Sequence, residues 1–418
     1  MERGWLVAAG VASALVAAGC SATQAPDGPQ VAALEPLAAE VTLAPASLPP
    51  TAPPGSTAPT TTAPPPATST TVAATTTTTS TTTTTIPWSV GPGSFAAFDQ
   101  SLAGRLIGNG AYGLSVAVAR DGEVVHTAGV GLANAFTGEK VTPQSIFRIA
   151  SVSKTLLAIA VMQLVDEGVL RLDQPVLDRV ADDLGIELGD PSMSAITLQH
   201  LLGHVSAIPE YERTFFGGVV GSCADAARRG LAGRLLGQPG TVFRYSNMNY
   251  CLLGLVVEQA TGRSYVDEVT TRVLEPLGIA DMHIASTATI GPGEVLHPTT
   301  PGRNFMEALG PAGAWVGTAE DLVRILDSVP TELAKKMARP AAFVPYPEPD
   351  RWYGLGMIVF DGGLSFGHTG TLEGARAMVV RRADGITWSV LVNGDAPWVS
   401  DRLRSYVGDA LATVDWTG

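Results

Sequence analysis

The sequence predicts an α/β (α+β) domain whose sheet is built from both ends of the folded region, with a helical insertion between them. Strand-like runs occur near its beginning and return near its end, and two strongly apolar helical stretches lie between. The strands expected at residues 114–119 and 123–127 flank Asp121-Gly122, a pair typical of a hairpin turn. Three more strands are expected near the end of the chain, at residues 354–360, 375–381 and 387–393.

The composition sets limits on both size and partners. The 418 residues are 45% hydrophobic, enough to bury a large core, and the formal net charge is −13. This acidity, with no run of Lys or Arg, argues against nucleic acid and against a basic membrane-binding patch. No phosphate-binding loop and no dinucleotide fingerprint occurs, so neither an organic cofactor nor a metal is expected.

The first twenty residues resemble an export signal. The apolar run at residues 5–18 is shorter than the roughly 20 residues that a membrane-spanning helix needs. It ends in Val16-Ala-Ala-Gly-Cys20, which resembles a bacterial lipobox, so residues 1–20 are predicted to be a signal peptide and Cys20 to be lipidated. We therefore expect a lipoprotein on the outer face of the cell membrane. The alternative is cleavage after a small residue and a free secreted protein.

Residues 21–90 differ in composition from everything that follows. Pro, Ala and Thr dominate, and the segment ends in the nearly pure threonine run at residues 76–85. With no apolar period and nothing to bury, it is predicted to be a disordered linker. The folded domain is expected at residues 91–418.

Two cysteines remain if Cys20 carries a lipid. In an oxidising compartment Cys223 and Cys251 are candidates for a disulfide. Two buried free thiols are the alternative, because sequence alone does not place two Cα atoms within bridging distance.

A serine and a lysine three positions apart begin the first apolar helical stretch. Residues at this spacing share one helix face, so the Lys154 amine can reach the Ser151 hydroxyl. A lysine can act as base toward a serine nucleophile if burial lowers its pKa. The apolar run at residues 156–165 indicates a buried helix, and Gly168 marks its end.

The region after this helix is expected to hold loops and short helices, around residues 170–175, 197–202 and 225–236. A second apolar helix is predicted at residues 250–260 and ends at Gly262. Two more are expected, one at residues 319–326 with Thr318 as its N-cap and a closing one at residues 399–412.

Two further segments carry candidate site residues. Tyr245, just before the second apolar helix, could relay a proton if a cation such as Lys154 lowers its pKa, and Asn247 could orient the lysine or bind a substrate amide. His368, Thr369, Gly370 and Thr371 are expected on an edge strand beside the serine. Such a strand can bind an extended substrate and donate a backbone N–H to an oxyanion.

Two other patterns are interpreted as coincidences. Residues 363–367 fit Gly-x-Ser-x-Gly around Ser365, but a strand and not a helix is expected to follow. His200 and His204 have the spacing of zinc-protease histidines, yet Leu201 stands where the glutamate is needed. We interpret them as structural histidines.

The segments Phe147-Arg-Ile-Ala-Ser-Val-Ser-Lys154, Tyr245-Ser-Asn247 and His368-Thr-Gly370 occur in this order. They resemble the motifs of the penicillin-recognising serine hydrolases, which comprise class C β-lactamases, D-alanyl-D-alanine carboxypeptidases and related esterases. The stretches at residues 201–209 and 353–356 have family counterparts too. The resemblance spans about residues 110–395 and implies the β-lactamase/transpeptidase-like fold, an antiparallel sheet flanked by helices.

The resemblance also implies roles for individual residues. Ser151 would be the acylated nucleophile, Lys154 and Tyr245 would share base and acid duty, and Asn247 would assist them. The backbone N–H groups of Ser151 and Thr371 would form the oxyanion hole, and His368 and Thr369 would line the substrate strand. His368 stands where many members have a lysine that attracts a substrate carboxylate, and a histidine is mostly neutral at pH 7.

These observations together predict an exported serine hydrolase that works through an acyl-enzyme, most simply on a D-alanyl-D-alanine peptide of the cell wall. A carboxylesterase acting on small acyl esters is the alternative enzyme, favoured by His368. A binding domain that has lost catalysis is the non-enzymatic alternative. The sequence does not specify the oligomeric state.

Overall fold

The computed structural model describes residues 94–341, 348, 350–394 and 400–416. The predicted signal peptide, Cys20 and the linker at residues 21–90 lie outside these residues. The described helices are α1 Ser94–Leu106, α2 Ser153–Asp166, α3 Leu177–Leu184, α4 Leu198–Leu202, α5 Glu212–Phe216, α6 Cys223–Leu231, α7 Asn247–Thr261, α8 Tyr265–Val269, α9 Phe305–Leu309, α10 Ala319–Ser328, α11 Thr331–Met337 and α12 Ser400–Leu411.

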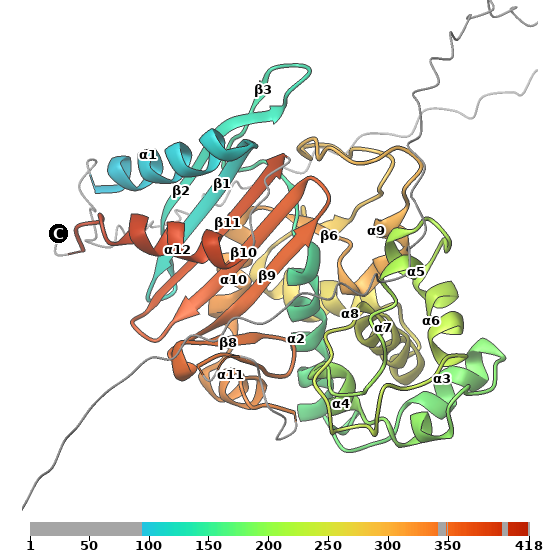
Figure 1. Ribbon diagram of the computed structural model, residues 1–418. Coiled ribbons are helices and arrows are strands. Elements are labelled where there is room, and N and C mark those ends of the chain that lie inside the picture. The colour runs from blue at the N-terminus through green and yellow to red at the C-terminus, as the bar shows by residue number, and fades with distance from the viewer. Residues whose placement is uncertain (1–93, 342–347, 349, 395–399, 417–418) are drawn as a thin grey trace, which may run out of the picture. The chain divides into compact units, whose positions relative to one another are not determined.

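The strands form two antiparallel sheets. Their bounds are β1 Ala111–Arg120, β2 Glu123–Asn134, β3 Glu139–Lys140, β4 Phe147–Arg148, β5 His283–Ile284, β6 Trp315–Gly317, β7 Trp352–Tyr353, β8 Ile358–Phe360, β9 Ser365–Leu372, β10 Ala375–Arg382 and β11 Ile386–Gly394. The large sheet has the order β3-β2-β1-β11-β10-β9-β8-β7, so that strands from both ends of the chain meet at the β1–β11 pair (Figure 1). The predicted architecture is confirmed.

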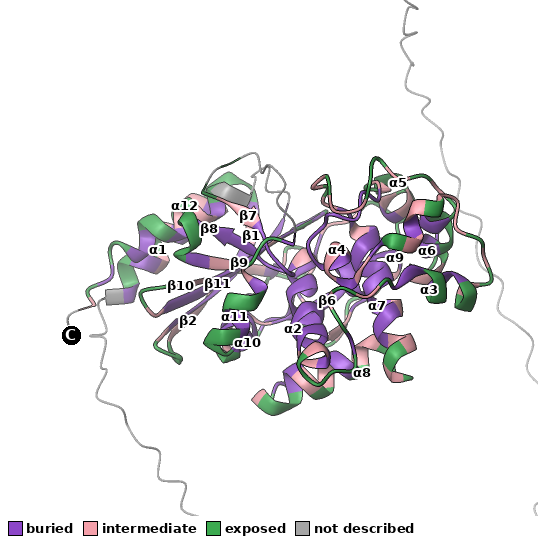
Figure 2. Cartoon of the chain, turned by 90° about the horizontal axis from the view of Figure 1, so that it is seen from below, coloured by how far each residue is buried: buried purple, intermediate pink, exposed green. Residues whose placement is uncertain are grey.

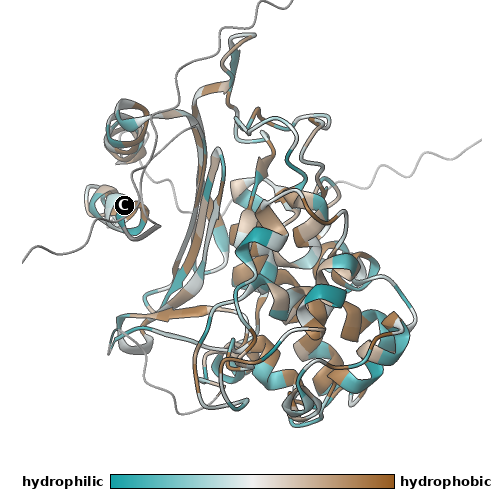
Figure 3. Cartoon of the chain, turned by 45° about the vertical axis from the view of Figure 1, so that its right-hand side comes forward, coloured by the Kyte–Doolittle hydropathy of each residue, from teal (hydrophilic) through white to brown (hydrophobic). Residues whose placement is uncertain are grey.

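Both faces of the large sheet are covered by helices. Seen edge-on, the sheet has helices on both sides, and the larger group lies on the side away from the C-terminus (Figure 3). On the other side, α1 and α12 pack on residues 114, 116 and 118 of β1. Ala117 and Ala119 of the same strand contact the larger helical layer. Because successive strand residues point to opposite faces, this apolar strand contributes side chains to the hydrophobic cores on both sides of the sheet.

Helices α2 and α7 form the centre of the helical layer. Both are apolar on nearly all sides and buried over most of their length, as Figure 2 shows for α2 and α7. Their predicted ends are confirmed: Gly168 and Gly262 follow them with φ of 76° and 69°, values that favour glycine. Helix α10 begins at the predicted Thr318, whose side chain forms a capping box with Asp321.

Several predicted elements differ from the observed ones. Strand β2 extends beyond the strand expected at residues 123–127, as far as Asn134, and the turn at residues 171–174 is followed by the unpredicted α3. Of the strand expected at residues 354–360, only β8 forms; residues 354–357 make the turn between β7 and β8, in which Gly354 N–H donates to the Met357 carbonyl. A side chain at Gly356 would come within 2.1 Å of the Ala158 Cβ on α2, so the apolar turn packs on the helix instead of pairing.

The position of β9 also differs from the prediction. It was expected at a sheet edge, but it lies between β10 and β8. Strand β8, however, pairs only with residues 365–367, whereas β10 pairs with all of residues 365–372. The part of β9 that carries the candidate site residues therefore extends beyond the ladder formed with β8.

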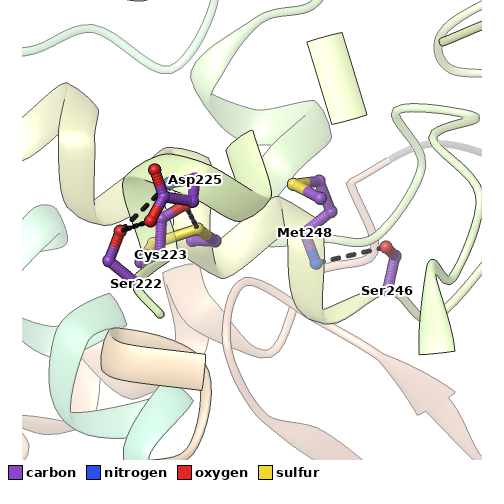
Figure 4. The surroundings of a disulfide bond; sticks show 6 residues. Ser222, Cys223, Asp225, Ser246 and Met248 are labelled. Carbon is purple, nitrogen blue, oxygen red and sulfur yellow. Dashed lines mark hydrogen bonds between the residues drawn. A yellow bond between two sulfur atoms is a disulfide. The ribbon is translucent and has the colours of Figure 1, made fainter. Parts of the chain in front are cut away.

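A disulfide joins Cys223 at the start of α6 to Cys251 on α7, with sulfurs 2.03 Å apart (Figure 4). Ser222 caps α6 next to it, and its hydroxyl accepts the N–H of Asp225. The bond ties α6 to the helix whose first residue is Asn247.

Removing this bond is expected to destabilise the protein. In the chain-entropy model the 28-residue separation corresponds to roughly 3.5 kcal/mol of unfolding free energy. The double variant Cys223→Ser/Cys251→Ser should lower the urea midpoint of the full-length protein, and a reducing agent should lower that of the wild type equally. A wild-type midpoint that does not change with reductant would contradict the bond.

No helix within the described ranges is long and apolar enough to cross a membrane.

Candidate active site

The segment before Ser151 is held in a strained conformation by the small sheet. Phe147 and Arg148 of β4 pair with β6, and Ile149 N–H donates to the Trp315 carbonyl (3.1 Å). Ala150 follows with φ of 50°, a value that non-glycine residues rarely adopt. The chain then forms a short 3₁₀ turn, Ala150–Val152, which leads directly into α2. Ser151 is thus presented at the head of a buried helix.

The Lys154 side chain is fully buried and makes three polar contacts. Its Nζ lies 3.0 Å from Ser151 Oγ, 2.8 Å from Asn247 Oδ1 and 2.6 Å from the Ala312 carbonyl oxygen. The predicted pair of residues is therefore brought together within hydrogen-bond distance. The role of Ala312 was missed, because a backbone carbonyl carries no sequence signal.

Burial lowers the pKa of Lys154 well below its ordinary value, as expected for a lysine acting as a base. No carboxylate forms an ion pair with Nζ among the described residues. A neutral amine has two N–H donors and one lone pair. It can donate to Asn247 Oδ1 and to the Ala312 carbonyl and still accept the Ser151 hydroxyl proton.

Tyr245 lies next to Lys154 and two residues before α7, which begins at Asn247. Its side chain is close enough to Ser151 for the serine to affect its pKa, and Lys154 Nζ lies 5.0 Å from the centre of its ring. The expectation that a cation lowers its pKa is wrong. Burial raises the pKa of Tyr245, because the phenolate would be desolvated and because a neutral Lys154 supplies no positive charge.

Asn247 is placed by the start of α7. Ser246 is the N-cap of this helix, and its hydroxyl accepts the Met248 N–H (Figure 4). Asn247 then begins the helix with its side-chain oxygen on Lys154. Of the two roles considered for this residue, orienting the lysine agrees with this contact.

Strand β9 passes very close to the turn that carries Ser151. A Cβ on Gly370 would come within 2.3 Å of the Ile149 carbonyl oxygen and 3.0 Å of the Ala150 Cβ, so only glycine fits there. This approach brings the neighbouring residues Thr369 and Thr371 to the cavity that Ser151 lines.

His368 is held in a single neutral form by two hydrogen bonds. Its Nδ1–H donates to the Thr369 carbonyl oxygen (2.6 Å), so Nε2 must accept the Tyr353 hydroxyl (3.0 Å). Burial lowers the pKa of His368 to about 3. Both ring nitrogens are occupied. Tyr353 was not predicted as a site residue and appeared only within a family-like stretch.

A cavity of about 640 Å³ opens over Ser151. Its lining is aromatic, including Phe216, Phe243 and Trp352, and it holds three carboxylates. The charged lining residues are Glu210, Glu212, Glu348 and Arg351. Glu348 lies 3.7 Å from Arg351, so the cation that the described residues contribute to this lining is close to an acid.

Ser365, His200 and His204, the residues of the other two patterns, do not line this cavity. Ser365 lies inside β9 and donates to Asp361 Oδ2. His200 caps α4 at the Thr197 N–H, whereas His204 is buried near Tyr245. Within the part of the chain that the structure describes, no group of three or more metal-ligating side chains occurs.

A serine with a buried lysine at hydrogen-bond distance and a tyrosine nearby, on this fold, defines a class of protein that attacks acyl groups through the serine. A sequence model of the Beta-lactamase family matches residues 98–412. The chain belongs to this family and is a serine hydrolase. A binding domain without catalysis is accordingly not supported.

Two similar proteins have been named for different activities. The chain is 28% identical to Esterase EstB of Burkholderia gladioli, over 76% of this chain and 93% of the esterase. It is 29% identical to Penicillin-binding protein 4 of Amycolatopsis lactamdurans, over 71% of this chain and 85% of that protein. The family is shared, and these names do not decide between activities.

Solved structures support the fold. The octameric penicillin-binding protein homologue from Pyrococcus abyssi has a TM-score of 0.64, with 24% identity and 77% of each chain covered. D-amino acid amidase from Ochrobactrum anthropi SV3 has a TM-score of 0.60, with 23% identity over 75% of this chain and 98% of the amidase.

Proposed function

We propose that this protein hydrolyses small acyl esters through an acyl-enzyme on Ser151. The Ser151 oxygen attacks the ester carbonyl carbon, and its proton passes to the neutral Lys154 amine. The alcohol leaves with a proton, and the acyl group stays on Ser151. Water then attacks the acyl-enzyme and releases a carboxylic acid and the free serine.

The proposed base is supported by the contacts of Lys154. Two of its three polar neighbours, Asn247 Oδ1 and the Ala312 carbonyl, can only accept hydrogen bonds from it. With both N–H groups used, the lone pair of the neutral amine is directed to Ser151 Oγ. Catalysis by a positioned base of this kind contributes about 10²- to 10⁴-fold.

Tyr245 is proposed to supply the proton to the leaving group. Burial raises its pKa, so the phenol stays protonated at neutral pH and can donate. Its proximity to Ser151 and Lys154 would place it beside the bond that breaks. Proton transfer between Tyr245 and Lys154 would restore both groups for deacylation.

The oxyanion hole is proposed to consist of the backbone N–H groups of Ser151 and Thr371. The close approach of Gly370 to Ile149 supports this assignment, because it brings β9 against the 3₁₀ turn that carries Ser151. Backbone donors held by a sheet cost little reorganisation when charge develops on the oxygen.

The observation that favours an ester over a peptide carboxylate is the state of His368. Both of its ring nitrogens are used within the protein, and burial keeps it neutral, so it offers no charge to a carboxylate. The carboxylates of the cavity would repel an anionic substrate. Arg351 in the cavity lining carries a positive charge that could attract a substrate carboxylate. It favours the second candidate, a D-alanyl-D-alanine carboxypeptidase.

Three substrates of similar size distinguish these candidates. The full-length protein is assayed with 4-nitrophenyl butyrate, with the hemisuccinate ester of 4-nitrophenol and with a D-alanyl-D-alanine peptide. We expect the highest kcat/KM for the neutral ester, and a deficit for the anionic ester that shrinks as salt screens the cavity charges. A higher kcat/KM for the peptide than for 4-nitrophenyl butyrate would contradict the esterase proposal and favour the carboxypeptidase.

We further propose that the enzyme acts outside the cytoplasm, attached to the membrane through Cys20 or secreted. The disulfide supports this proposal, because such bonds persist in oxidising compartments. Metabolic labelling with a palmitate analogue, compared between the wild type and Cys20→Ala, tests the lipid anchor.

A further inference from the structure

We propose that His204 is a positioning residue that fixes Tyr245 in its place beside Ser151. This inference rests on the proposed role of Tyr245 as proton donor. His204 follows the short helix α4, Leu198–Leu202, and is not part of the Ser151, Lys154 or His368 segments. It does not touch the reacting atoms and acts through Tyr245.

The backbone and side chain of His204 hold the residues on both sides of Tyr245. Its carbonyl oxygen accepts the Arg244 N–H (2.8 Å), and its Nδ1 accepts the Ser246 N–H (3.2 Å). The same Nδ1 lies 3.0 Å from the Asn249 side-chain nitrogen on α7. One residue thus bridges the chain segment before Tyr245 and the first turn of the helix after it.

The imidazole of His204 also packs directly on the tyrosine. The two ring centres are 4.3 Å apart, with an angle of 38° between the ring planes. Tyr353, which donates to His368, packs edge-on against the same imidazole with a centre distance of 4.6 Å. The ring of Tyr245 is therefore held by a contact on its surface as well as by its two neighbours in the chain.

The hydrogen bonds of His204 decide its form. Since Nδ1 accepts two N–H donors, the ring proton is on Nε2, and the imidazole is neutral. Burial lowers the pKa of His204, because the imidazolium would be desolvated. A protonated ring would lose the Nδ1 acceptor and release the Ser246 N–H.

Two features of His204 are unfavourable for stability and would not be expected of a residue with a purely structural role. It is fully buried, and its Nε2 has no hydrogen-bond partner among the described residues. Its φ of 57° lies in the left-handed region, which residues other than glycine rarely adopt. Both features cost stability, and an apolar residue would fill the space without the unpaired N–H. The acceptor at Nδ1 is the property that an apolar residue lacks.

Two substitutions separate the acceptor from the packing. In His204→Asn the side-chain oxygen takes the position of Nδ1 and can accept the Ser246 N–H. In His204→Leu the volume is similar but the acceptor is gone. Both are compared with the wild type in the full-length protein, using 4-nitrophenyl butyrate. The burst of nitrophenol counts the molecules that form an acyl-enzyme, so kcat is expressed per active site and a loss of folded protein does not affect it.

We expect His204→Leu to lower kcat per active site by about 10²-fold, with KM changed much less, because small misplacements of a catalytic group have effects of this size. His204→Asn should recover most of the activity. In a Tyr245→Phe background, His204→Leu should have little further effect, since the two residues act as a unit. Exposed Glu187, changed to Gln, serves as a control outside the cavity.

Three results would overturn the proposal. They are a His204→Leu variant with wild-type kcat per active site, a His204→Asn variant as impaired as His204→Leu, and a full additional loss in the Tyr245→Phe background. Each of these leaves the proposed function intact if Ser151→Ala is inactive. Activity remaining in Ser151→Ala would instead overturn the proposed function itself.

Discussion

Replacing Ser151 by alanine is expected to abolish ester hydrolysis. The hydroxyl is the only group of the Ser151, Lys154 and Tyr245 cluster that can form the acyl-enzyme, so kcat should fall by about 10⁴-fold or more. The fold should remain, because Ser151 is partly exposed at the cavity and supports no core contact. The measurement is turnover of 4-nitrophenyl butyrate together with mass spectrometry, which should detect the acylated wild type and no acylated variant.

The matched control for this variant is Ser365→Ala. Ser365 also lies in a serine-containing motif, Gly-x-Ser-x-Gly, but it is inside β9 and bonded to Asp361. Most of the wild-type activity should survive this change. If Ser365→Ala were inactive while Ser151→Ala turned over substrate, the nucleophile would be misassigned.

Replacing Lys154 by methionine is expected to lower kcat by between about 10² and 10⁴-fold, the contribution of a positioned general base. Methionine has nearly the length of lysine without the amine, so the buried space stays filled. Lys335→Met, on an exposed part of α11, is the control and should retain activity. A Lys154→Met variant within a few-fold of the wild type would remove the lysine from the mechanism.

The same variant has a consequence for the pH dependence of stability. Burial lowers the pKa of Lys154 in the folded protein, whereas in the unfolded chain the amine titrates near 10.5. Between these two pKa values the unfolded chain binds a proton that the folded protein lacks. The free energy of unfolding therefore rises with pH over this window, and the penalty disappears above 10.5.

Urea unfolding at several pH values measures this effect. The unfolding free energy of the wild type minus that of Lys154→Met should rise with pH up to about 10.5. A difference that stays constant with pH would mean that Lys154 is charged in the folded protein. The neutral amine, and with it the proposed base, would then be wrong.

Local patterns predicted a large part of this protein. The Ser151–Lys154 spacing, the glycines after α2 and α7 and the Thr318 cap all depend on contacts within a few residues, and the structure has them where they were expected. The hairpin at Asp121-Gly122 is likewise a local feature. Such interactions can be read from sequence because the residues that make them are neighbours in the chain.

The predictions that were wrong depended on which residues lie next to each other in space. The pKa of Tyr245 was expected to fall, but its direction depends on burial and on the charge of Lys154, which burial removes in turn. The strand expected at residues 354–360 is broken because Gly356 packs on α2, a helix almost two hundred residues earlier. Neither effect has a signature within its own segment.

The sequence by itself therefore determined the type of chemistry, since it supplies a serine, a lysine one helical turn later, a tyrosine and a glycine-bearing strand. Only the tertiary structure decided how these groups are tuned. It brings the Ala312 carbonyl, 158 residues away, into hydrogen-bond distance of Lys154. It also hydrogen-bonds His368 to Tyr353 and packs the His204 ring against that of Tyr245. The physical reason is that pKa values and hydrogen-bond saturation depend on burial and on neighbours in space, which form only when distant segments pack together.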